Sequence, residues 1–278
     1  MKIYAFADEA SPDIDGQIAA LKENGLDGLE IRNVDGVNVS EISAAKAREV
    51  RKKTDAAGLA VWSVGSPIGK INIEKDDFKT HKEKFRRTLE TAEILGARNI
   101  RLFSFYIPKD KNPDDYGNEV IERLGSLAEY AVGSGITLCH ENEKGIYGDI
   151  FERCVKIHKA LPGIKAVFDP ANFVQCGVDT LKAWDALKDC TEYLHIKDAL
   201  ADGSVVPAGK GIGNLPEILG SYRARNGRAV TLEPHLKVFD GLSSLENVGE
   251  KSVVGEVYSY PSNAAAFKAA ADALKQLI

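Results

Sequence analysis

The sequence predicts an α/β fold, specifically a (β/α)8 TIM barrel, and three observations point to it. Helix-like stretches repeatedly end at a glycine, and a short β-rich segment begins within one to three residues of it. With a first strand near residues 2–8 and another near residues 192–197, eight strands alternate with eight candidate helices. The length of 278 residues is typical of such a barrel. Strict alternation indicates parallel strands joined by helical crossovers.

Six glycine junctions define most of the strands in chain order. Glycine tolerates the left-handed conformation that ends many helices, so each junction predicts a helix end followed by a buried strand. The junctions are Gly25 before Leu26–Ile31, Gly58 before Leu59–Val64, Gly96 before Ala97–Phe103, Gly135 before Ile136–Glu141, Gly163 before Ile164–Asp169, and Gly227 before Arg228–Glu233.

Apolar residues at three- and four-residue spacing predict the helices. The first helix is expected to start at Ser11-Pro12, as N-cap and first helical residue, before Ile14, Ile18 and Leu21. Similar stripes occur around residues 85–92 and 267–278, and the helix near Thr180–Leu187 is the least clearly marked. A doubly wound open sheet is the competing architecture. The barrel is favoured because no glycine-rich dinucleotide fingerprint follows the first strand.

We expect one domain, residues 1–278, with a long connection after the last strand. The stretch from Glu233 to Pro261 exceeds a normal loop, and residues 239–260 are interpreted as a lid over the active face. A surface excursion or an oligomer contact is the alternative interpretation of this segment. The sequence therefore leaves open whether the chain forms a homo-oligomer.

Composition limits the partners and the compartment. The net charge is −5 and the pI is near 5.7, which gives no general attraction to nucleic acid or to anionic membranes. The four cysteines form no Cys-x-x-Cys pair, as expected for reduced thiols in a cytoplasmic protein. No signal peptide is recognised, and no apolar run approaches the ~20 residues that cross a bilayer. We expect a cytoplasmic protein with no nucleic-acid or membrane partner.

The last four predicted strands each end in a side chain that can bind metal. These residues are Glu141, Asp169, His195 and Glu233. Catalytic groups of a barrel lie at the carboxyl ends of its strands, and neighbouring strands are about 4.8 Å apart, so one ion can bridge the four tips. Oxygen ligands with one imidazole favour Mn²⁺, with Mg²⁺, Co²⁺ and Zn²⁺ as alternatives. The simpler interpretation is that each carboxylate only caps the next helix.

The segments around these residues resemble the sugar isomerase/epimerase superfamily of xylose-isomerase-like barrels, which also contains the apurinic endonucleases. The matching segments are His-Glu141-Asn-Glu, Phe-Asp169-Pro-Ala-Asn172, His195-Ile-Lys197-Asp198 and Leu-Glu233-Pro-His235, with weaker matches at Ala-Asp8-Glu9 and Gly-Leu-Glu30-Ile. The likeness covers essentially the whole chain.

The resemblance implies roles for the matching residues. It implies that Glu141 and Glu233 bind the metal and also move protons on opposite faces of the substrate, while Asp169 and His195 complete the metal site. Asn172 stands where many relatives have a histidine, which argues against an endonuclease that uses several zinc ions. Asn172, Lys197 and His235 are predicted to bind substrate. The loop Gly209–Gly213 looks like a phosphate loop but is interpreted as a flexible connection, and Asp198 is expected to orient the loop or its neighbour His195.

The sequence and the resemblance together predict a metal-dependent isomerase or epimerase acting on a small-molecule carbohydrate or a related hydroxy-carbonyl compound. The reaction would remove an α-proton and pass through an enediolate. A lyase or dehydratase acting on an inosose or a 3-keto-glycoside shares the same first step. A non-catalytic sugar-binding barrel is the third alternative.

Overall fold

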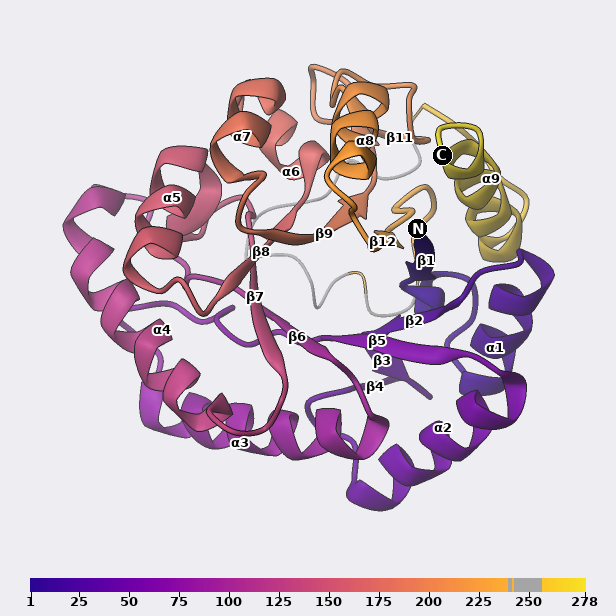
Figure 1. Cartoon of the computed structure of the whole chain (residues 1–278), viewed down its shortest axis with the longest axis horizontal. Helices are drawn as coiled ribbons and strands as arrows, with labels where there is room; N and C mark the ends of the chain where they lie inside the picture. Colours follow the sequence, from indigo (N-terminus) through magenta and orange to yellow (C-terminus); the bar gives the residue numbers. More distant parts are fainter. Residues whose placement is uncertain (240–241, 243–256) are drawn as a thin grey trace.

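Eight parallel strands close into a barrel in this computed structural model, which describes residues 1–239, 242 and 257–278 (Figure 1). Their order around the barrel is β1-β12-β9-β8-β7-β6-β5-β2, so the predicted fold is confirmed. The barrel strands are β1 (Lys2–Ala5), β2 (Gly28–Ile31), β5 (Ala60–Gly65), β6 (Asn99–Leu102), β7 (Thr137–Glu141), β8 (Lys165–Phe168), β9 (Thr191–Ile196) and β12 (Ala229–Leu232). Two short antiparallel pairs lie outside the barrel: β3 (Asn33–Val34) with β4 (Val37–Asn38), and β10 (Asp198–Ala199) with β11 (Val205–Val206).

Helices surround the barrel and connect its strands (Figure 1). Within the described residues they are α1 (Ile14–Glu23), α2 (Ala44–Ala57), α3 (Phe78–Leu95), α4 (Gly117–Ala131), α5 (Phe151–Ala160), the short α6 (Pro170–Gln175), α7 (Thr180–Leu187), α8 (Leu215–Ala224) and α9 (Asn263–Lys275). Helix α7 has the predicted bounds despite its weak pattern. Most of the predicted lid lies outside the described residues.

Local capping explains most of the helix boundaries. Gly58 and Gly96 adopt the left-handed conformation, with φ of 72° and 67°, and end α2 and α3 as predicted. The same explanation is wrong for Gly227: Asn226 has the positive φ of 61°, and Gly227 is needed because a Cβ there would lie 2.3 Å from the Tyr222 ring. The predicted start of α1 is also wrong by two residues. Asp13 is the N-cap, because its carboxylate accepts the Gly16 N–H.

Alternate residues of the strands fill the barrel interior. One cluster of buried side chains there consists of Tyr4, Trp62, Cys139, Val167, Tyr193 and Ala229. Cys139, Val167 and Tyr193 each precede a predicted metal ligand by two residues, so the ligands have the inward orientation that strand alternation requires. Trp62 stacks on Tyr4 at 5.2 Å between ring centroids and is part of this barrel core.

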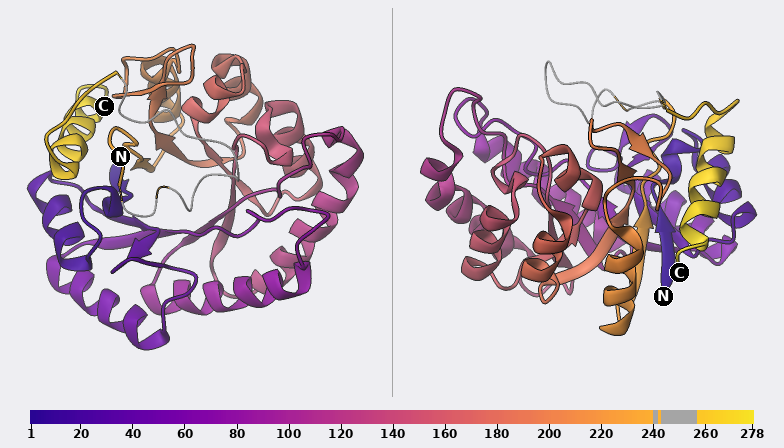
Figure 2. Two further views of the ribbon diagram at one scale, coloured as in Figure 1. Left: turned by 180° about the vertical axis from the view of Figure 1, so that it is seen from behind. Right: turned by 90° about the horizontal axis from the view of Figure 1, so that it is seen from above.

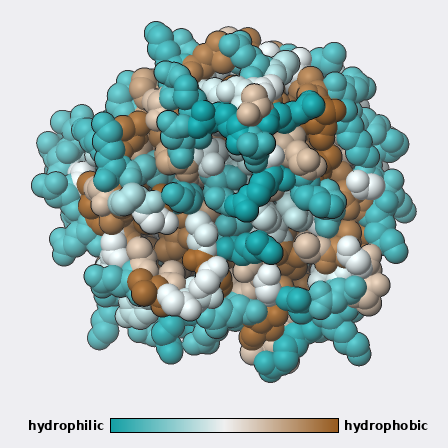
Figure 3. Space-filling view, viewed as in Figure 1, coloured by the Kyte–Doolittle hydropathy of each residue, from teal (hydrophilic) through white to brown (hydrophobic). Residues whose placement is uncertain are grey.

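The two chain ends lie close together on one side of the barrel (Figure 2). The face of the molecule in Figure 3 is mostly hydrophilic, and its apolar residues lie in small separate patches. Among the described helices, none combines the length and the apolar composition that crossing a membrane requires.

A buried histidine makes the stability of the barrel depend on pH. The Gly69 N–H donates to His81 Nε2 at 2.8 Å, and burial lowers the pKa of His81 from 6.5 to about 4. Between these values the unfolded chain binds a proton that the folded protein does not, so acidification should lower the free energy of unfolding by up to about 3 kcal/mol. Urea denaturation at pH 7 and pH 4.5 measures the loss. His81→Gln keeps an acceptor without a titrating ring, and a loss of equal size in this variant would contradict the assignment.

Candidate metal centre and active site

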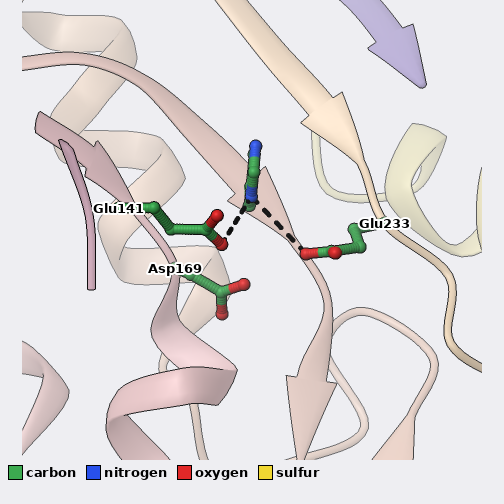
Figure 4. A group of neighbouring side chains, drawn as sticks. Glu141, Asp169 and Glu233 are labelled. Atoms are coloured by element: carbon green, nitrogen blue, oxygen red, sulfur yellow. Dashed lines mark hydrogen bonds and ion pairs between the residues drawn. The ribbon is translucent and has the colours of Figure 1, made fainter. Parts of the chain in front are cut away.

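Four buried side chains meet where consecutive barrel strands β7, β8, β9 and β12 end. Glu141 is the last residue of β7, Asp169 and Glu233 directly follow β8 and β12, and His195 lies near the end of β9. One ligand atom from each residue lies within 4.8 Å of the others. The carboxylates of Glu141, Asp169 and Glu233 point toward a common centre (Figure 4). The structure therefore brings together the four residues that the sequence singled out.

The donor set fits a divalent cation. Asp169 uses its two oxygens differently: Oδ1 accepts the Asn172 N–H at 2.9 Å and caps α6, while the buried Oδ2 lies 3.0 Å from the Lys197 ammonium. Burial also raises the pKa of Asp169 to about 7, although Lys197 opposes this shift. Three buried carboxylates that converge beside an imidazole repel one another, and a divalent cation held between them would offset that repulsion. Asp169 can therefore cap α6 and also serve as a metal ligand.

His195 is fixed on both sides of its ring. Its Nδ1 lies 2.9 Å from Glu141 Oε1 and 3.5 Å from Glu233 Oε2, and its Nε2 lies 3.0 Å from Glu30 Oε2. Glu30 also accepts a hydrogen bond from the Tyr193 hydroxyl at 2.8 Å. Nδ1 therefore faces the ligand cluster, and Nε2 is placed to donate to Glu30, the usual arrangement behind a metal-binding histidine. The sequence match at Glu30 is weak, yet this residue contacts the predicted ligand His195.

Glu30 should therefore control metal affinity without touching the metal. Glu30→Gln keeps an acceptor and loses the charge, whereas Glu30→Met loses both. We expect affinity losses of about 10-fold and about 100-fold respectively, the range for partners of a metal ligand. Calorimetric metal titration would measure them, with the melting temperature of the metal-free variants recorded in parallel. Tyr193→Phe removes one hydrogen bond to Glu30 Oε1, leaves those from Ser63 and His195, and is the control. A loss as large in Tyr193→Phe as in Glu30→Met would contradict a specific role for the Glu30–His195 contact.

Two buried arginines contact the two predicted proton-transfer residues. Arg101 Nη1 lies 3.1 Å from Glu141 Oε2, and Arg32 Nη1 lies 3.5 Å from Glu233 Oε1. Both guanidinium groups pack on the Phe6 ring, at 5.1 and 4.4 Å from its centroid. Burial raises the pKa of Glu141, but His195 and Arg101 outweigh burial and lower it to about 2. These arginines were not predicted from the sequence. Strand alternation could have indicated them, because Arg32 follows Glu30 by two residues and Arg101 follows Asn99 by two, so each shares an inward-facing side.

A second group of possible ligands shares Glu233 with the first. Glu9, Glu233 and His235 each place one ligand atom within 4.8 Å of the others. Arg32 Nη2 lies 3.2 Å from Glu9 Oε1, and its Nη1 contacts Glu233, so a guanidinium cation already lies against both carboxylates. The arrangement therefore favours one metal ion in the cluster around Asp169, with Arg32 as a fixed cation beside it.

The three predicted substrate-binding residues line one small cavity next to the cluster. Asn172 Nδ2 donates to the Asn142 carbonyl at 2.9 Å and lies 3.4 Å from Glu141 Oε1. Lys197 is 6% exposed, and its Nζ lies 3.0 Å from both Asp169 Oδ2 and Glu233 Oε2. His235 has a positive φ of 45°, and its buried Nε2 has no hydrogen-bond partner. All three are placed to contact a bound molecule.

The glycine-rich loop after β9 binds an internal carboxylate. Asp198 accepts four backbone N–H groups at 2.9–3.0 Å, from Ala199, Gly209, Gly211 and Gly213. The expectation that this loop is merely a flexible connection is therefore wrong: Asp198 fills the position that a phosphate would occupy in a phosphate loop. The loop holds the chain that follows Lys197 in one conformation.

A family model matches most of the chain. The model described as xylose isomerase-like TIM barrel matches residues 18–276. The chain belongs to this family. Among curated proteins, no significant sequence match is found for this xylose isomerase-like barrel.

Solved structures of other proteins share the fold over nearly the whole chain. A D-psicose 3-epimerase, solved in the presence of D-fructose, is 20% identical with a TM-score of 0.75, covering 99% of this chain and 98% of its own. The IolI protein with a bound zinc atom is 17% identical with a TM-score of 0.74, covering 100% and 98%. A probable 3-DHS dehydratase, AsbF from Bacillus anthracis, is 16% identical with a TM-score of 0.74, covering 99% of both chains. At these identities the likeness establishes the fold of this xylose isomerase-like barrel.

Proposed function

We propose that this protein is a metal-dependent isomerase or epimerase of a sugar or sugar-derived hydroxy-carbonyl compound, working by α-proton abstraction with an enediolate intermediate. The observation that carries the proposal is the placement of Glu141 and Glu233. They come from β7 and from the end of β12, and both approach His195 Nδ1, at 2.9 and 3.5 Å. A substrate carbon held between them would have one carboxylate available on each side.

Glu141, Asp169, His195 and Glu233 are the residues that would hold the ion. When bound, it supplies Lewis-acid polarisation of the substrate carbonyl, which acidifies the adjacent C–H. The oxygen-rich donor set favours Mn²⁺, with Mg²⁺, Co²⁺ and Zn²⁺ as alternatives. The zinc atom bound by the IolI protein, which shares the fold, supports the proposal of a divalent metal.

The protein's own groups would manage the proton. One glutamate removes the α-hydrogen, and the other returns a proton to the opposite face, which inverts the carbon in an epimerase. Arg101 and Arg32 contact these glutamates through Nη1, so each base keeps a fixed cation beside it. Burial of all four groups keeps water away from the reacting carbon, and electrostatic stabilisation of the enediolate is stronger there than in water.

A lyase or dehydratase acting on an inosose or 3-keto-glycoside is the second candidate. It shares the α-proton step but ends with loss of a leaving group, so one base is enough. The dehydratase among the structural neighbours favours this candidate. A non-catalytic sugar-binding barrel is disfavoured, because binding alone does not require two buried carboxylates held beside arginines.

Proton NMR in D₂O tests the proposal. Metal-loaded protein is mixed with ketoses, keto-acids and keto-glycosides, and deuterium incorporation at the α-carbon is followed. We expect incorporation for at least one compound, abolished by chelation and restored by Mn²⁺. Product with the inverted centre identifies an epimerase, and loss of water identifies a dehydratase. Exchange that continues at the same rate after chelation would contradict metal dependence.

A further inference from the structure

We infer that the substrate carries an anionic group, a carboxylate or a phosphate, which pairs with Lys197 and the adjacent arginines when the metal is bound. This inference rests on the proposed function and narrows its substrate class from carbohydrates in general to acidic ones.

Cations dominate the wall of the cavity beside the ligand cluster. Arg32, Lys70, Arg101 and Lys197 line it together with two carboxylates, Glu143 and Glu233, and Lys70 is paired with Glu143 at 2.7 Å. Three of the four cationic side chains are at most 5% exposed, those of Arg32, Arg101 and Lys197. Neutral hydroxyl groups can be bound by amides and single charges, so three buried cations around one small cavity exceed what a neutral sugar needs.

Lys197 and a metal ion would compete for the same oxygens. The ammonium lies 3.0 Å from Asp169 Oδ2 and 3.0 Å from Glu233 Oε2, and both residues belong to the predicted ligand set. A dication held by these carboxylates would repel the nearby ammonium and weaken the attraction between the carboxylates and Lys197. Lys197 would then face the cavity as a buried charge with weaker pairing, which is unfavourable unless another anion is present.

Arg32 and Arg101 are both held through Nη2, and the Nη1 group of each points toward the ligand cluster. Arg32 binds Asp8 through Nε and Nη2 at 2.9 and 3.0 Å, and its Nη1 points to Glu233. Arg101 binds the Gly65 carbonyl through Nη2 at 3.1 Å, and its Nη1 points to Glu141. Once the two glutamates bind metal, these Nη1 groups retain hydrogen-bonding capacity for a further acceptor, and both arginines stay charged.

Lys197, Arg32 and Arg101 are better suited to bind an anion than a hydroxyl group. A carboxylate or phosphate oxygen accepts several charge-assisted hydrogen bonds at once, whereas a hydroxyl is a weaker acceptor. An anionic substrate would restore the pairing that Lys197 loses to the metal. A neutral sugar would leave the ammonium without an anion of its own.

Two matched sets of compounds test the inference on the metal-loaded protein. One set is D-fructose, D-fructuronate and D-fructose 6-phosphate, and the other is dihydroxyacetone, hydroxypyruvate and dihydroxyacetone phosphate. Calorimetry and melting-temperature shifts at constant ionic strength measure binding. We expect at least one anion to bind about 10- to 100-fold tighter than its neutral counterpart, as a hydrogen bond to a charged group would provide. Comparison of the carboxylate with the phosphate in each set identifies the anionic group.

Variants of Lys197 separate the charge from the shape of the side chain. Lys197→Met should bind Mn²⁺ more tightly than the wild type, because a competing cation is gone, and should lose the preference for anions. Lys197→Arg should keep that preference, and Lys210→Met, an exposed lysine in the same loop region, should behave as wild type.

Neutral compounds binding as tightly as the anions, or no anion binding at all, would overturn the inference. So would weaker metal binding by Lys197→Met, since it would show that lysine and metal do not compete. An anion that binds but exchanges no α-hydrogen would contradict the proposed reaction while leaving the anionic substrate class intact.

Discussion

Replacing either Glu141 or Glu233 by glutamine should lower turnover about 10²-fold or more, the range for loss of a general acid–base group. The reason is that each carboxylate would serve one face of the substrate, from β7 and from the end of β12. In D₂O, one variant should still exchange the α-hydrogen of the substrate without forming product. The other should exchange the α-hydrogen of the product but not that of the substrate.

Metal content has to be measured with these rates, because loss of the ion would imitate loss of the base. The amide of glutamine keeps one oxygen that can coordinate weakly, so metal is supplied in excess. Glu152→Gln changes an exposed glutamate on α5 and is the matched control, expected at wild-type activity. Near wild-type turnover in both metal-loaded variants would refute the proton-transfer roles. A large effect at only one position would favour the lyase or a one-base isomerase.

Asp169→Asn should weaken metal binding by more than the roughly 10- to 100-fold expected for a residue that only supports a ligand. The substitution is well suited to the question, because asparagine retains the oxygen that caps α6 through the Asn172 N–H. What it removes is the negative charge that the buried Oδ2 presents to the cluster. Calorimetric titration with Mn²⁺ and Zn²⁺ would give the affinity.

Asn172→Ala provides the comparison for Asp169→Asn. Asn172 lies three residues later and contacts Glu141 Oε1 only at 3.4 Å, so its loss should change metal affinity little and substrate binding more. Equal metal affinity in the wild type and in Asp169→Asn would remove Asp169 from the ligand set. The carboxylate would then be only a helix cap.

Much of the fold could be predicted from the sequence because its signals are local. Gly58 and Gly96 end helices through their own backbone conformation, and two-residue alternation directs Glu141 and His195 inward. The same alternation could have identified Arg101, which follows Asn99 on β6 with inward parity. A basic residue at a strand end has several ordinary explanations, so the signal was present but not distinctive.

The residues that contact the predicted metal ligands could not be predicted in the same way. Glu30 reaches His195 across 165 positions of sequence, and Arg32 reaches Glu233 across 201. Such contacts depend on which strands become neighbours and how far each side chain extends into the barrel. Asp198 was expected to orient the loop or His195, but the loop N–H groups that it accepts depend on the path of the backbone after β9. The start of α1 was misplaced because two possible caps, Ser11 and Asp13, lie two residues apart and hydrogen-bond to each other.

Metal titration of the chelator-treated wild-type chain tests the central claim most directly. Four convergent ligands predict one divalent ion bound per chain, a rise in melting temperature that grows with metal concentration, and loss of both effects in Asp169→Asn. Protein that binds no divalent ion and shows no metal-dependent change in melting temperature would contradict the account.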